Sequence, residues 1–145
     1  MIQITKTIEW HMGHRIPNHD GQCRYPHGHS YRLELTLSGP LVKEQGAPDE
    51  GMIVDFSLVS QALKTHVKDL LDHRFVAYDQ DPLLKKAFAG DLGEELKIFF
   101  VPFIPTSENL VKWCYLQLKD VFPPKINVVK LRLYETSKSW SDYVL

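Results

Sequence analysis

The stretch HGHSYRLELTLS, residues 27–38, decides the fold class because its apolar and polar residues alternate. Successive side chains of a β-strand point to opposite faces, so odd positions share one face and even positions share the other. The odd positions hold Tyr31 and three leucines, whereas the even positions hold mainly small polar and charged residues. Residues 27–38 are therefore predicted to form a half-buried strand. His27 and His29 fall on its apolar face. Two imidazoles on a face that points to the core are unusual and call for an explanation.

Three further segments have the same period of two. Residues 2–14, IQITKTIEWHMGH, place isoleucines, a tryptophan and His14 on one face. Residues 126–135, INVVKLRLYE, place valine and leucine on one face and continue that face to Glu135. Residues 140–145, WSDYVL, predict a last strand. Three of the four predicted strands thus carry a polar side chain on an apolar face.

Two segments change to helical spacing. Apolar residues recur at helical intervals within residues 55–75 and again within residues 105–122, where Thr106 stands at the capping position. A short helix is expected within residues 82–89 and a short buried strand within residues 97–103. The order strand, strand, helix, helix, strand, strand predicts an α+β fold, an antiparallel four-stranded sheet with two helices on one face.

Composition excludes several classes of protein. A chain of 145 residues suggests one domain, residues 1–145. With a net charge of −1, no strong electrostatic attraction to nucleic acid or to anionic membranes is expected. No apolar run reaches the roughly 18 residues of a membrane helix, and the N-terminus lacks the pattern of a signal peptide. A cytoplasmic location is therefore the default expectation.

The histidines on the apolar faces form a candidate metal site. A lone buried histidine is more often a satisfied core residue than a ligand, and His-x-His alone is a weak signal. Here His27 and His29 project the same way, and His14 arrives from a second strand. Three neutral imidazoles suit zinc and leave a fourth position open for water or substrate. The spacing is thus compatible with a metal site and with core packing.

Cys23, four residues before His27, has three interpretations. It is a fourth ligand in a closed structural site, a thiolate nucleophile or base whose pKa a nearby cation lowers, or an inert thiol. The other cysteine, Cys114, lies among apolar residues of a predicted helix and is expected only to pack.

Two further sites carry carboxylates. Asp72 precedes His73 at the end of the first long helix, where the dipole favours a histidine and where a carboxylate could also orient a proton-relaying imidazole. Glu135 is either a strand-end residue that reaches water or a buried group that grips a planar pair of hydrogen-bond donors.

Six motifs occur in the order and approximate spacing of a known family: GHRI, CRYPHGHSY, GMIVDF, LDHRF, PTSENLVKW and YETSKSW. From about residue 8 to its C-terminus, the chain resembles the 6-pyruvoyl-tetrahydropterin synthase family. It is most similar to the bacterial 6-carboxy-5,6,7,8-tetrahydropterin synthase branch, which shares the three-residue gap between Cys23 and His27. The resemblance implies the tunnelling fold (ββααββ), whose sheets join into barrels as trimers stack into a homohexamer.

The resemblance also implies roles for single residues. It implies zinc ligands at His14, His27 and His29, a catalytic base at Cys23, a relay pair at Asp72 and His73, a pterin anchor at Glu135, and pterin contacts at Thr106 and Ser107. A helix cap explains Thr106 equally well. Arg24, Arg74 and Lys138 are candidates for phosphate contacts. One departure is WHMGHRI, which replaces the usual small residues before the first ligand, so His11 and Met12 are expected at the pocket rim.

The implied substrate is 7,8-dihydroneopterin triphosphate, and the implied products are 6-carboxy-5,6,7,8-tetrahydropterin, acetaldehyde and triphosphate, on the route to queuosine. The alternatives are a 6-pyruvoyl-tetrahydropterin synthase and a non-catalytic module that binds zinc or pterin. A zinc hydrolase is a weaker rival. An intact set of Cys23, Asp72 and His73 favours turnover over binding alone.

Overall fold

The centre of the molecule is an antiparallel pair of twelve-residue strands, β1 (Gln3–His14) and β2 (His27–Ser38). The structure is a computed structural model that describes residues 1–89 and 92–145. The register of the pair runs without interruption from Gln3 opposite Ser38 to His14 opposite His27. β5 (Asn127–Thr136) pairs with β2, and β6 (Ser139–Val144) pairs with β5. All four predicted antiparallel strands are therefore confirmed.

Two short parallel strands extend this sheet beyond β1. β3 (Phe75–Tyr78) pairs with the last two residues of β1, and β4 (Ile98–Val101) pairs with β3. The sheet is thus six-stranded and mixed, in the order β4-β3-β1-β2-β5-β6. The α+β class is confirmed, but the predicted count of four strands was too low. A strand of four residues directly after a helix is too short for its period to be recognised.

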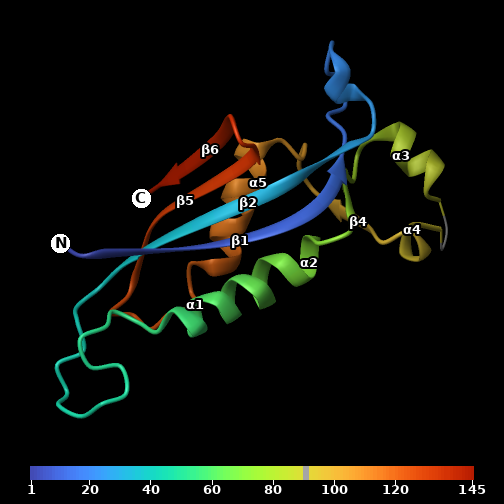
Figure 1. Ribbon diagram of the computed structural model, residues 1–145. Coiled ribbons are helices and arrows are strands. Elements are labelled where there is room, and N and C mark those ends of the chain that lie inside the picture. The colour runs from blue at the N-terminus through green and yellow to red at the C-terminus, as the bar shows by residue number, and fades with distance from the viewer. Residues whose placement is uncertain (90–91) are drawn as a thin grey trace.

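The two long helices pack on one face of the sheet, as predicted (Figure 1). The first is a continuous rod of α1 (Phe56–Leu63), a π-helical turn η2 (Lys64–Lys68) and α2 (Asp69–Leu71). The second is α5 (Ser107–Leu118). α1 contacts β1, and α5 contacts β5 and β6. The shorter helices are η1 (Gln22–Arg24), α3 (Pro82–Ala87) and α4 (Leu92–Glu95).

Side-chain caps fix the starts of the helices. Asp55 accepts a hydrogen bond from the Ser57 amide at the start of α1, and Thr106 Oγ1 accepts one from the Asn109 amide at 3.3 Å at the start of α5. The cap predicted at Thr106 is confirmed. None of the helices among the described residues combines the length and the apolar character that a membrane crossing needs.

The two faces of the sheet differ in the burial of their side chains. The inward face of β1, β2 and β5 packs with both long helices into one cluster whose fully buried members include Tyr31, Leu33, Leu63, Leu118 and Leu133. We call the opposite face, which carries Glu9, His11 and Ser30, the outward face. These three side chains are exposed, and neither long helix packs on that face. Strand alternation therefore assigns each site residue to one face or the other.

Candidate metal centre and active site

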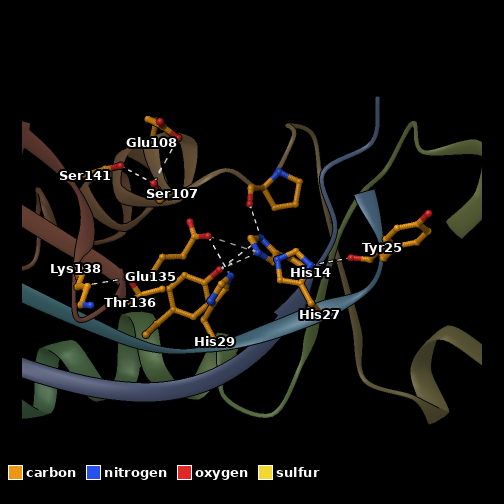
Figure 2. Close-up of polar contacts among 12 residues, drawn as sticks. His14, Tyr25, His27, His29, Ser107, Glu108, Glu135, Thr136, Lys138 and Ser141 are labelled. Carbon is orange, nitrogen blue, oxygen red and sulfur yellow. Dashed lines mark hydrogen bonds and ion pairs between the residues drawn. The ribbon is translucent and has the colours of Figure 1, made fainter. Parts of the chain in front are cut away.

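The three predicted ligands meet where β1 ends and β2 begins. His14 lies directly opposite His27 in the strand register, and His29 lies opposite Met12. All three imidazoles project from the inward face, and one ring nitrogen of each lies within 4.8 Å of those of the other two (Figure 2). The structure thus brings together a histidine group that can hold a metal ion. Among the described residues, this group contains neither a cysteine nor a carboxylate.

Backbone carbonyls fix the orientation of two of these rings. His14 Nδ1 donates to the Pro105 carbonyl at 2.7 Å, and His27 Nδ1 donates to the Tyr25 carbonyl at 2.7 Å. A carbonyl can only accept, so Nδ1 is protonated in each ring, and in the neutral form of such a ring Nε2 keeps its lone pair. This is the arrangement that metal-binding histidines use, and it aims two Nε2 atoms at a common point.

The Nε2 atoms of His27 and His29 are buried. That of His27 has no hydrogen-bond partner among the described residues, whereas that of His29 has the Glu135 carboxylate oxygen 3.0 Å away. A buried polar atom without a partner is costly, and a bound metal ion would supply the missing interaction. The donor set therefore fits zinc, which neutral imidazoles bind with one coordination position left open.

Burial favours the neutral form of two of these imidazoles, those of His14 and His29. It is the largest cause that lowers the pKa of His14 to about 4, and the neighbouring His27 and His29 lower it further, against the opposing effect of the hydrogen bond to Pro105. Burial also lowers the pKa of His29, again with a contribution from His27. The neutral form is the one that binds metal, so burial prepares this group for an ion at neutral pH.

Tyr31 lies below the histidines on the same face of β2. Its hydroxyl is 3.4 Å from both ring nitrogens of His14, and its own ring stacks on Trp10. Burial raises the pKa of this hydroxyl, so it stays protonated. Tyr31 is thus a neutral polar contact at the floor of the site.

Glu135 lies beside the histidine group, on the inward face as its register predicts. Figure 2 shows its carboxylate extending from β5 toward His14 and His29. Its Oε1 is 3.0 Å from His29 Nε2 and 3.9 Å from His14 Nε2. Burial raises its pKa, His27 opposes that shift, and Glu108 adds to it. The site therefore holds a partly desolvated carboxylate next to three imidazoles.

The start of α5 forms another wall of the site. Ser107 Oγ is 2.5 Å from Ser141 Oγ of β6, and it donates to Glu108 Oε2 at 3.4 Å (Figure 2). The hydroxyl of Thr106 is engaged in the helix cap. Ser107 thus connects α5 to β6 close to Glu135. Thr106 caps the N-terminus of α5, which is a structural role.

The two cysteines differ in surroundings. Cys23 is a free, partly exposed thiol in η1, in the loop between β1 and β2. Its sulfur is not part of the metal-binding group, so the interpretation of Cys23 as a fourth ligand gains no support from the geometry. Cys114 is fully buried in α5, and burial raises its pKa to about 12, which makes it an inert packing residue.

Asp72 and His73 form a pair, but on the other side of the sheet. His73 Nδ1 lies 3.0 Å from Asp72 Oδ1, which also accepts a hydrogen bond from the His11 amide at 3.0 Å. That bond is the largest cause that lowers the pKa of Asp72. The His73 side chain is 73% exposed and packs against His11, which projects from the face of β1 opposite to His14. Within one chain, the structure does not bring this pair to the histidine group.

The three candidate phosphate contacts are widely separated. Arg24 stacks on Tyr25 and donates to its hydroxyl at 2.6 Å. Lys138 lies in the turn between β5 and β6, where its amide donates to Thr136 Oγ1. Arg74 lines a hollow on the outward face.

Some site features were absent from the sequence-based prediction. Tyr31 shares the odd register of His27 and His29, so alternation could have included it. The carbonyls of Tyr25 and Pro105 leave no signal in residue type, because every residue carries one.

Comparisons with known proteins give a consistent result. Residues 3–144 match the family model described as 6-pyruvoyl tetrahydropterin synthase. A protein of Haemophilus influenzae named 6-carboxy-5,6,7,8-tetrahydropterin synthase is 34% identical over 144 residues, which cover 99% of each chain. An uncharacterized protein from Wolinella succinogenes superposes with a TM-score of 0.83 at 23% identity, covering 99% of this chain and 97% of the other. The Caenorhabditis elegans 6-pyruvoyl tetrahydropterin synthase superposes with a TM-score of 0.69 at 22% identity, covering 99% and 95%. The last two show a shared fold.

Proposed function

The chain belongs to the 6-pyruvoyl tetrahydropterin synthase family, and from this premise we propose that it is a zinc-dependent lyase of the 6-carboxy-5,6,7,8-tetrahydropterin synthase type. It converts 7,8-dihydroneopterin triphosphate and water to 6-carboxy-5,6,7,8-tetrahydropterin, acetaldehyde and triphosphate. The name of the Haemophilus influenzae relative supports the carboxy product over the pyruvoyl product. We place the reaction in the cytoplasm, on the route to queuosine.

The observation that carries the proposal is the geometry of His14, His27 and His29. Their three rings converge from two adjacent strands, and the buried Nε2 of His27 has no hydrogen-bond partner among the described residues. Zinc bound there would act as a Lewis acid on the side-chain oxygens of the substrate and make the neighbouring C–H bond more acidic.

The remaining site residues remove the proton, orient an imidazole and bind the pterin ring. Cys23 lies in the loop that joins the two ligand strands, and its thiolate takes the proton from the substrate side chain. Asp72 accepts a hydrogen bond from His73 Nδ1 and so fixes the tautomer and orientation of that imidazole for proton transfer. Glu135, with Thr106 and Ser107 nearby, holds the pterin ring, because a carboxylate accepts two parallel hydrogen bonds from its guanidine-like edge.

This division of roles needs more than one protomer. His73 lies on the outward face, whereas the histidine group lies on the inward face of the same chain. We therefore place His73 of one subunit beside the metal group of another, in a homohexamer built as a dimer of trimers. The free edges of the sheet favour such an assembly, since β6 ends the sheet on one side and β1 pairs with β3 only at Gly13 and His14.

Product analysis tests the activity directly. The purified protein is incubated with 7,8-dihydroneopterin triphosphate, and products are followed by chromatography with mass detection and a coupled acetaldehyde assay. We expect the carboxy product and acetaldehyde in equal amounts. A pyruvoyl product without acetaldehyde would instead establish the runner-up activity, and pterin binding without any product would identify a non-catalytic module.

A further inference from the structure

The outward face is hollowed at the end of β1 and β2. A hollow of about 580 Å³ lies there, which we call the outward hollow. Its floor is made by Gly13 and Gly28, which stand opposite each other in the strand register. A Cβ on Gly13 would lie 2.8 Å from the Phe75 ring, and one on Gly28 would lie 3.1 Å from the Met12 carbonyl. The hollow thus depends on two positions that lack side chains.

Hydrogen-bond donors surround this floor. His11, Ser30, His73 and Arg74 all line the outward hollow. Ser30 Oγ lies 3.0 Å from His11 Nδ1, so when the hydroxyl donates, His11 carries its proton on Nε2 and can donate to a ligand. No carboxylate is among the described residues that line the hollow, but the Asp72 carboxylate lies 3.0 Å from His73 Nδ1 and occupies that donor.

Arg74 is the fixed positive charge of the hollow. Arg15, Arg32 and Arg132 each pair with a carboxylate, whereas no carboxylate among the residues with described positions forms an ion pair with Arg74. An arginine fork without a protein partner suits a phosphate group, which it can bind through two parallel hydrogen bonds.

The backbone holds these donors in place before any ligand binds. The His73 amide donates to the His11 carbonyl at 2.7 Å, and the Gly13 amide donates to the Arg74 carbonyl at 2.9 Å. His73 has a φ of 58°, a left-handed conformation that such contacts maintain. A preorganised set of donors loses little entropy when an anion binds.

We propose that the outward hollow is a polyphosphate subsite in which Arg74 and His11 bind the triphosphate of the substrate and of the product. This inference rests on the proposed function. The triphosphate is attached to the same three-carbon side chain from which the proton is removed. The subunit that supplies His73 to a site must therefore also lie beside the phosphates, and Arg74 is the next residue along the chain.

Binding of inorganic triphosphate to the intact protein tests the subsite without a need for turnover. Titration calorimetry compares the native protein with Arg74→Gln, Arg74→Lys and His11→Asn. Arg32→Gln is the matched control, because Arg32 projects from the outward face but pairs with Glu34 and stacks on Tyr134. Thermal unfolding and light scattering verify that each variant is folded and assembled.

We expect Arg74→Gln to weaken triphosphate binding about tenfold or more, as the loss of a charge-assisted pair predicts. Arg74→Lys should keep part of the affinity, His11→Asn should lose a smaller factor, and Arg32→Gln should bind like the native protein. Unchanged binding in Arg74→Gln, or equal losses in Arg74→Gln and Arg32→Gln, would overturn the subsite. Triphosphate binding that depends on Arg74 in a protein without pterin turnover would instead refute only the proposed function.

Discussion

The three candidate ligands are held by different backbone constraints. His14 is fixed by the carbonyl of Pro105, which lies 91 positions away in the sequence, whereas His27 is fixed by the carbonyl of Tyr25, only two positions away. Strand alternation and the register of β1 with β2 then bring both rings to His29. The geometry of the group is therefore a property of the folded sheet, to which each residue type contributes only a donor nitrogen.

Removal of one imidazole should abolish tight zinc binding. We expect His27→Ala and His29→Ala to retain less than about a tenth of the zinc of the native protein, because two remaining ligands cannot hold the ion. Metal analysis after gel filtration measures this content, with His66→Ala on the helical rod as the control. Full zinc in either folded ligand variant would refute the assignment.

The thiol of Cys23 should be needed for chemistry but not for the metal. Cys23→Ala is expected to keep one zinc per chain and to lose about 10²- to 10⁴-fold in kcat, the range for removal of a general base. Cys114→Ala is the matched control, since Cys114 is a buried packing residue of α5. If Cys23→Ala loses its zinc, Cys23 is a ligand and the site is structural.

The sequence contained enough information for the inward-facing residues of the site. Strand alternation alone predicted the face on which His14, His27, His29 and Glu135 lie, and each lies on that face, whereas their roles as ligands and pterin anchor were decided only by the family resemblance. Parity could not locate His73, because it follows a helix and takes a positive φ that no local pattern indicates. Its place on the outward face depends on hydrogen bonds to His11, which are contacts between segments distant in sequence.

Among the elements, the long periodic segments were predicted closely, whereas the short ones were predicted only in part. β1, β2 and α5 follow the predicted ranges closely because each has twelve residues of regular pattern. β3 has four residues and was missed, although it holds His73 and Arg74 against the end of β1. The strand predicted within residues 97–103 exists as β4, but only Val101 of it is buried because β4 lies at the sheet edge.

Asp81 connects two of these elements and should matter for stability. Its Oδ1 caps α3 through the amides of Leu83 and Leu84, and its Oδ2 lies 3.1 Å from Arg15 Nε, directly after the first ligand. The carboxylate is 1% exposed, so its loss leaves a partly buried arginine without a partner. We expect Asp81→Ala to lower the free energy of unfolding by about 3 kcal/mol.

Chemical denaturation at one fixed protein concentration measures this effect, because assembly also contributes to stability. Asp55→Ala is the control, since Asp55 caps α1 from a fully exposed position and should cost much less. Equal effects of the two substitutions would show that the pair with Arg15 adds nothing.

At the scale of the whole molecule, the sheet has one covered face and two open edges. The outward face is polar, with an ion pair between Arg132 and Asp142 and an arginine stacked on Tyr134. We expect light scattering to give the mass of six chains at working concentration. The mass of a single chain, together with full activity, would contradict the proposed hexamer.

Subunit mixing tests whether active sites lie between chains. If His73 of one subunit lies beside the metal group of another, each site takes its Cys23 and its His73 from different subunits. Cys23→Ala and His73→Ala then remove groups that different subunits supply. Hexamers that contain both variants should then include sites with a native Cys23 and a native His73. Random assembly predicts activity in about a quarter of the sites, although each variant alone is nearly inactive.

The decisive control mixes Cys23→Ala with His27→Ala. Cys23 and His27 lie on the same short segment of one chain, four positions apart, so no mixed hexamer can rebuild a native site from these two variants. Activity should therefore return only in the first mixture, measured after co-expression with two distinguishable tags and isolation of the doubly tagged hexamers. If neither mixture recovers activity, His73 acts within its own chain or not at all.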